Sequence, residues 1–214
     1  MLRQSISRNS ALLAAFAVCT ALLLTGTYLL TDERIASQIR QAEEKALLEI
    51  VPKSRHDNSM LDDTLPVGPG AEGLGLRQEK NIYLARRGGE VVAAIIPVTA
   101  RDGYSGDIEL IVGVNADGSI AGVRAQSHKE TPGLGDQVSL NKSDWILDFN
   151  GRSLENPLPD RWAVKKDRGV FDQFTGATIT PRAVVAATLR ALEYARDHRK
   201  TLFGAADPAT PEGA

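Results

Sequence analysis

The chain has 214 residues, of which 43% are apolar and 24% are charged, and its formal net charge is -2. This composition is typical of a globular protein and excludes a disordered chain, a collagen and a polytopic membrane protein. Without a strongly basic surface, nucleic-acid binding is not expected. One cysteine and three scattered histidines do not make an iron–sulfur or zinc site. We therefore expect no metal, and any redox chemistry requires an organic cofactor.

An uncharged stretch, residues 11–30, predicts a transmembrane helix. At 1.5 Å per residue it spans about 30 Å, the thickness of the hydrocarbon core of a bilayer. Arg3 and Arg8 precede it and the first acid is Asp32. The positive-inside rule then leaves residues 1–10 in the cytoplasm and everything after Thr31 on the far side of the membrane. The alternative, a cleaved signal peptide, would have a shorter apolar region, so we expect a single-pass anchor in the lipid bilayer.

Residues 31–75 predict a stalk helix followed by a loop. Apolar side chains recur at helical spacing between residues 32 and 50, and Pro52 ends the pattern. The stretch 53–75 is polar, contains proline and glycine, and has no periodicity, so it predicts a loop.

Residues 76–203 predict a domain built on an antiparallel sheet. Short apolar runs separated by turn residues indicate consecutive strands at 82–85, 91–98, 107–114 and 119–127. Residues 141–171 give no clear assignment. The pair Thr180-Pro181 predicts the start of a helix that continues to His198, with the threonine hydroxyl as its cap. Residues 204–214 are expected to be disordered. The fold class is therefore α+β, with one transmembrane helix followed by an antiparallel-sheet domain with flanking helices.

The first segment that suggests chemistry is a glycine-containing loop directly after a predicted strand. Proline and glycine prevent this strand from continuing, and glycine lets a backbone approach a flat or anionic ligand closely. By itself the pattern fits a connecting loop equally well. We call this segment the glycine loop; it consists of Glu130, Thr131, Pro132, Gly133, Leu134 and Gly135.

The second segment, residues 172–178 with the sequence DQFTGAT, lies just before the predicted final helix. We call it the threonine loop. Small residues precede Thr178, so its hydroxyl is accessible, and the free N–H groups of a helix start suit a phosphate. A threonine hydroxyl is a poor nucleophile at neutral pH, so its attachment to a phosphate would need an external catalyst with a metal. From the residues alone, a hydroxyl-rich helix cap remains open as an alternative.

Together, the layout and the two loops resemble the G subunit of Rnf-type (Rsx) electron transport complexes, an FMN-binding membrane protein. The resemblance extends over nearly the whole chain. The family's flavin-attachment pattern is Asp-x-x-Ser/Thr-Gly-Ala-Thr, and the residues that match it are Asp172, Thr175, Gly176, Ala177 and Thr178. The C subunit of the sodium-pumping NADH:quinone reductase shares both loops but is usually longer, and it stays as the alternative family.

The resemblance implies that Thr178 bears FMN through a phosphoester bond, which a dedicated flavin transferase makes from FAD. It also implies that the chain relays electrons between other subunits of a complex that moves ions, with its domain on the periplasmic side of a bacterial inner membrane. We expect the isoalloxazine ring to pack near the glycine loop, whose backbone can approach it closely. The chain contains no nucleotide-binding fingerprint, so we expect that it does not bind NADH directly. We also expect no independent catalytic site in this chain. A flavin-free tethered assembly or binding protein is the alternative function.

Overall fold

A computed structural model describes residues 2–204 of the chain; for residues 2–8 and 33 it describes the backbone alone. Two compact units are present, one ending at Glu44 and the other beginning at Lys45. Apart from Gly204, the tail that was expected to be disordered lies outside the described residues.

Helix α1 (Leu2–Ile50) is continuous from the predicted membrane span into the predicted stalk. It ends just before Pro52, as the position of that proline predicts. Among the residues that the structure describes, α1 alone is long and apolar enough to cross a membrane, with a mean hydropathy of 2.0 in its apolar stretch. Within the stalk, Ile35 and Ile39 are exposed, whereas Ile50 is buried.

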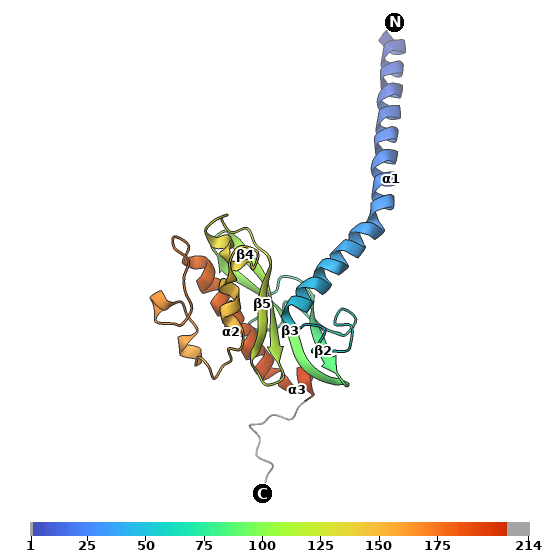
Figure 1. The fold of residues 1–214 in the computed structure, drawn as a ribbon. Coiled ribbons are helices and arrows are strands. Elements are labelled where there is room, and N and C mark those ends of the chain that lie inside the picture. The colour runs from blue at the N-terminus through green and yellow to red at the C-terminus, as the bar shows by residue number, and fades with distance from the viewer. Residues whose placement is uncertain (1, 205–214) are drawn as a thin grey trace. The chain divides into compact units, whose positions relative to one another are not determined.

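The second unit is built on a five-stranded antiparallel sheet whose strands follow chain order, β1-β2-β3-β4-β5 (Figure 1). Each strand pairs with the next in the chain, so the predicted meander is confirmed. The strands are β1 (Thr64–Val67), β2 (Lys80–Arg87), β3 (Glu90–Gly103), β4 (Gly106–Asn115) and β5 (Ile120–Ser127). This sheet and its helices form the α+β fold that the sequence predicts.

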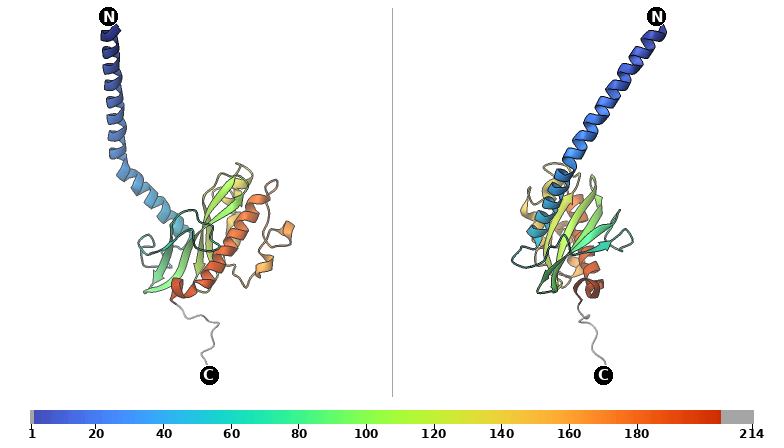
Figure 2. Two further views of the ribbon diagram at one scale, coloured as in Figure 1. Left: turned by 180° about the vertical axis from the view of Figure 1, so that it is seen from behind. Right: turned by 90° about the vertical axis from the view of Figure 1, so that its right-hand side faces the viewer.

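The central strand β3 contributes to two hydrophobic clusters because successive side chains of a strand point to opposite faces. On one face, Ala94 and Ile96 pack in the main core with helix α2 (Ile179–Asp197), which lies across the sheet in Figure 2. On the other face, Ala93 and Ile95 belong to a smaller cluster with the last turn of α1. A short helix, α3 (Arg199–Phe203), follows α2.

The last turn of α1 fits into a depression in the sheet formed by two glycines. A Cβ at Gly113 would overlap the Cγ2 atom of Ile50, and a Cβ at Gly122 would lie 3.4 Å from the same atom. Arg124 of β5 reinforces this contact, because its Nε donates to Glu49 Oε2 at 3.2 Å and its Nη2 donates to the Glu49 carbonyl at 3.1 Å. At position 113 only a residue without a side chain leaves room for Ile50, whereas the distance at position 122 is that of an ordinary van der Waals contact.

Gly113→Ala should therefore destabilise the protein by about 1–3 kcal/mol, the usual cost of adding a methyl group to a packed core. Urea unfolding of the full-length protein in detergent, followed by tryptophan fluorescence, measures this change. Gly68→Ala is the matched control, because nothing lies within 4 Å of a Cβ at Gly68. Equal stability of the two variants would contradict the proposed packing of Ile50.

The predicted loop 53–75 is partly wrong. It contains the short edge strand β1, and the following segment buries Leu74 and Leu76 completely. Arg101 holds this segment on the sheet by donating to the carbonyl oxygens of Gly75 and Leu76 at 2.8 and 2.9 Å.

Residues 141–171, which gave no clear assignment, contain three short 3-10 helices: η2 (Asp144–Phe149), η3 (Pro159–Arg161) and η4 (Lys165–Asp167). A fourth, η1 (Gly135–Val138), precedes them. Aromatic rings organise this region: the Phe149 and Phe171 rings stack with centroids 4.6 Å apart, and Trp145 contacts Phe149 edge-on at 5.3 Å. Aromatic packing, together with backbone hydrogen bonds of short turns, thus shapes the segment that leads to the threonine loop.

Candidate functional site

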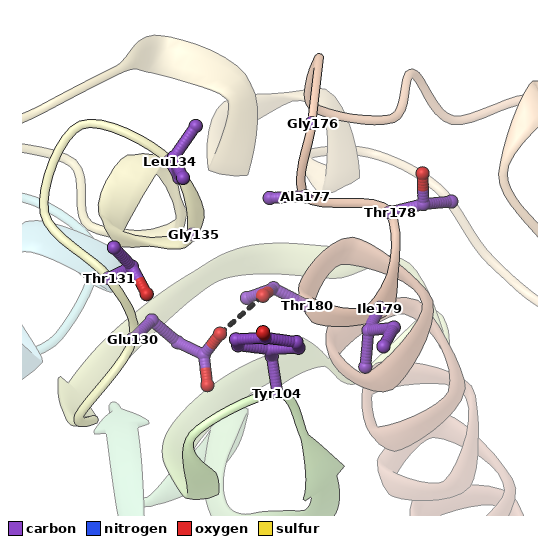
Figure 3. Close-up of a pocket in the computed structure, with 10 residues that line it drawn as sticks. All are labelled: Tyr104, Glu130, Thr131, Leu134, Gly135, Gly176, Ala177, Thr178, Ile179 and Thr180. Carbon is purple, nitrogen blue, oxygen red and sulfur yellow. Dashed lines mark hydrogen bonds between the residues drawn. The ribbon is translucent and has the colours of Figure 1, made fainter.

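The glycine loop and the threonine loop, which are far apart in the sequence, line one small pocket at the start of α2 (Figure 3). Its volume is about 90 Å³. The lining residues are Tyr104, Glu130, Thr131, Leu134, Gly135, Gly176, Ala177, Thr178, Ile179 and Thr180. Of the residues predicted to bind the cofactor, Pro132, Gly133, Asp172 and Thr175 do not line it.

Glu130 connects three segments around the pocket. Its side chain is only 5% exposed. One carboxylate oxygen, Oε1, accepts a hydrogen bond from the backbone N–H of Ser105 at 2.9 Å, and Oε2 accepts one from the Thr180 hydroxyl. A Cβ at Gly135 would lie 2.7 Å from this carboxylate and 2.8 Å from the Thr180 hydroxyl. The glycine at position 135 is therefore required by the buried Glu130 side chain.

The prediction that Thr180 caps the helix is wrong. The N-cap of α2 is Thr178, and Thr180 is a fully buried residue of the first turn. Because its hydroxyl donates to Glu130, it holds the start of α2 on the glycine loop.

The backbone N–H groups of Gly133, Leu134 and Gly135 are used within the glycine loop and its continuation. Gly133, at φ +76°, donates to Asp136 Oδ1 at 2.7 Å. The N–H groups of Leu134 and Gly135 both donate to the Thr131 carbonyl at 3.1 Å. These three N–H groups are therefore not directed at a ligand, and the loop offers the Leu134 side chain and a close backbone surface, which suits a flat ring.

Aromatic contacts anchor the threonine loop. The buried Phe174 ring lies 4.9 Å from Trp145, and the Trp145 indole N–H donates to the Asp172 carbonyl at 2.8 Å. Ala177 N–H donates to the Phe174 carbonyl at 3.1 Å, which closes a turn that includes Gly176 at φ +80°. This tight turn brings Thr178 to the head of α2.

Thr178 is half-buried, and its hydroxyl does not cap the helix that it begins. Figure 3 shows its side chain pointing away from the Glu130–Thr180 hydrogen bond. The first N–H groups of a helix lack partners within the helix, and they carry its partial positive charge. A phosphate on the Thr178 oxygen would lie in that field.

Two cationic side chains near the threonine loop, Arg182 and Lys165, are paired with carboxylates. The Arg182 guanidinium on the first turn of α2 donates to the Asp167 carboxylate at 2.5 and 2.7 Å, and these hydrogen bonds hold the pKa of Asp167 below its ordinary value. Lys165 lies 2.7 Å from Asp172 on the surface. No lysine, arginine or histidine is among the lining residues described for the pocket.

Comparison with known proteins places the chain in a family. A model of the RnfG N-terminal region matches residues 1–50, and a model of the FMN-binding domain matches residues 103–193. Relatives named as the G subunit of an ion-translocating oxidoreductase complex are 46% identical in Pseudoalteromonas atlantica and in Pseudomonas aeruginosa. The first alignment covers 96% of this chain and 95% of the relative, and the second covers 98% of each. The chain belongs to this G-subunit family. The match confirms the family that the two loops predict.

The solved crystal structure of the C subunit of Na(+)-translocating NADH-quinone reductase from Parabacteroides distasonis is also similar to the chain. The sequences are 20% identical, the alignment covers 62% of this chain and 75% of the other chain, and the TM-score is 0.47.

The FMN-binding domain match begins at Gly103, so it includes the turn between β3 and β4, the glycine loop, the threonine loop and most of α2.

Sequence reasoning missed an apolar rim on the pocket of this G-subunit protein. The Tyr104 side chain is 69% exposed, Ile179 is 44% exposed and Leu134 is 41% exposed. Tyr104 stands on the turn between β3 and β4, next to Gly103 and Gly106. An aromatic residue on an exposed glycine-bearing turn was the available signal, because a turn has no structural need for a large apolar side chain.

Proposed function

We propose that the chain is the flavoprotein subunit of an ion-translocating oxidoreductase complex, and that it carries FMN covalently on Thr178. The position of Thr178 carries this proposal. Within the FMN-binding domain match, Thr178 is half-buried and lines the pocket at the head of α2, and its hydroxyl does not cap the helix. FMN, when bound, accepts one or two electrons, so it can pass electrons between a partner that transfers two at a time and a partner that transfers one.

The attachment is a phosphoryl transfer from FAD. The Thr178 oxygen forms a bond to the phosphorus atom of the FMN part, the bond between the two phosphates of FAD breaks, and AMP leaves. The proton of the hydroxyl passes to the catalytic base of a partner enzyme, a metal-dependent flavin transferase. The product is a phosphodiester at a helix N-terminus, where the helix dipole stabilises its remaining negative charge.

The small pocket does not enclose a three-ring flavin, because sites that bury such ligands have volumes of about 300–1,000 Å³. The apolar rim instead suits a ring that lies over the pocket. Tyr104, Ile179 and Leu134 would contact its apolar surface, and the glycine loop would let the backbone approach it. One part of the ring then stays accessible to the redox centre of another subunit.

Helix α1 would anchor this domain in the inner membrane, and the basic residues Arg3 and Arg8 keep the N-terminus in the cytoplasm. The flavin would then face the periplasm. A membrane-impermeant thiol reagent should label Ser105→Cys in intact cells, after Cys19→Ser has removed the native thiol. Labelling that requires cell lysis would reverse this orientation.

The covalent bond is tested by the mass of full-length protein expressed with and without the flavin transferase. The expected increase is the mass of FMN less one water, and it should appear only with the transferase. Trypsin releases the peptide from Gly169 to Arg182, which contains Thr175, Thr178 and Thr180. Fragmentation should place the flavin on Thr178. A bare peptide from native material would instead favour the flavin-free tethered binding protein.

A further inference from the structure

We propose that the Glu130 carboxylate lowers the reduction potential of the flavin by placing a fixed negative charge in the floor of the pocket. This inference rests on the proposed function. As a member of the glycine loop, Glu130 was expected to contact the cofactor. Here it has a second role, in which its negative charge makes the uptake of electrons by the flavin less favourable.

The hydrogen bonds of Glu130 favour a charged carboxylate. Both oxygens accept hydrogen bonds, one from the Ser105 N–H and the other from the Thr180 hydroxyl. An ionised carboxylate is an acceptor only and matches two donors, whereas a protonated carboxyl group would have to donate at one oxygen. The geometry therefore fits an anion held in place by neutral donors.

No lysine, arginine or histidine is among the described residues that line the pocket. His128 contacts the backbone of Glu130, since its Nδ1 accepts from the Glu130 N–H at 3.3 Å. The partial positive charge at the start of α2 offsets only about half a unit charge. A buried charge without a cationic partner costs folding free energy. A neutral amide could make both hydrogen bonds without this cost, so the hydrogen bonds alone do not explain why a carboxylate is found here.

Each electron taken up by the flavin adds negative charge above the pocket. In a partly dehydrated site, repulsion between this charge and Glu130 is stronger than in bulk water. Reduction therefore becomes less favourable, and the potential falls. In the titration described below, dithionite is the reductant that supplies the electrons, and the flavin is the acceptor.

Glu130→Gln removes the charge and keeps the geometry. The glutamine oxygen can accept from the Ser105 N–H, and its amide can donate to the Thr180 oxygen. Asp136→Asn is the matched control. Asp136 is also buried, accepts from the Gly133 N–H at 2.7 Å, and does not line the pocket. Thr180→Val is a second control, since it removes the hydroxyl that holds the carboxylate but leaves the charge.

The experiment uses full-length protein expressed with the transferase and purified in detergent. Flavin content is measured first by intact mass, and the midpoint potential is then measured by spectroelectrochemical titration with dithionite. Glu130→Gln should shift the equilibrium about tenfold toward reduced flavin, which is about 59 mV for one electron. Asp136→Asn should shift it much less, and Thr180→Val should not raise the potential.

Three outcomes would overturn the inference: an unchanged potential in Glu130→Gln, an equal rise in Thr180→Val, or a Glu130→Gln protein that folds but carries no flavin. The last would make Glu130 a residue needed for attachment rather than for the potential. Wild-type protein without covalent flavin would instead refute the proposed function, so the two failures are distinguishable.

Discussion

Thr178→Ala should abolish covalent flavin attachment completely, because the substitution removes the oxygen atom that forms the bond to phosphorus. The fold should be unaffected, since the Thr178 hydroxyl does not cap α2. On a denaturing gel viewed under ultraviolet light, the wild-type band should fluoresce and the Thr178→Ala band should be dark. Circular dichroism of the same samples checks that the variant is folded.

Two further variants test whether the hydroxyl at position 178 is what attachment requires. Thr178→Ser keeps a hydroxyl at the head of α2 and should retain fluorescence. Thr175→Ala makes the same change as Thr178→Ala three residues earlier, at an exposed position outside the pocket, and should also keep covalent flavin. A fluorescent Thr178→Ala band would move the attachment to another residue.

Gly169→Ala should have the largest effect on the structure that supports the threonine loop. A Cβ at this position would overlap the carbonyl group of Ala163, which is backbone and cannot rotate away. The turn is closed by hydrogen bonds from Gly169 N–H to the Val164 carbonyl at 3.0 Å and from Phe171 N–H to the Ala163 carbonyl at 3.2 Å. We expect a loss of about 3 kcal/mol or more in the free energy of unfolding.

Flavin attachment should fall sharply in Gly169→Ala although Thr178 is intact, because the displaced segment leads directly into the threonine loop. Urea unfolding and gel fluorescence measure the two effects. Gly70→Ala is the control, because no atom lies within 4 Å of a Cβ at Gly70. Normal flavin content in Gly169→Ala would show that the threonine loop is positioned independently of the preceding turn.

The strands of the sheet were predictable because each carries a run of apolar residues bounded by turn residues, and because short turns allow only antiparallel neighbours. Strand β1 was missed for a physical reason. It has four residues, includes Pro66, and lies at the edge of the sheet, where few backbone hydrogen bonds are needed. The 3-10 helices in 141–171 were missed because aromatic packing, rather than periodicity, shapes them.

The site was predictable as two loops but not as one pocket. The sequence pattern identifies both loops, but only the meander and α2 bring Glu130 close to Thr180. The role of Thr180 was misjudged because a threonine before proline has the pattern of a helix cap, whereas its hydroxyl is bonded to a carboxylate fifty residues away in the sequence. For Tyr104 the sequence offered only one signal, a large aromatic side chain on a glycine-bearing turn, and that signal does not show where the turn lies in space.

The packing of Ile50 against Gly113 and Gly122 determines where a water-soluble version of this protein can begin. A fragment starting at Lys45 would keep Leu47 and Ile50 on the second face of the sheet. A fragment trimmed to start at Pro52 would instead expose Ala93, Ile95 and Ile111 to water. Crystallisation and solution studies of the flavin domain therefore require a truncation point inside α1, several residues before that helix ends.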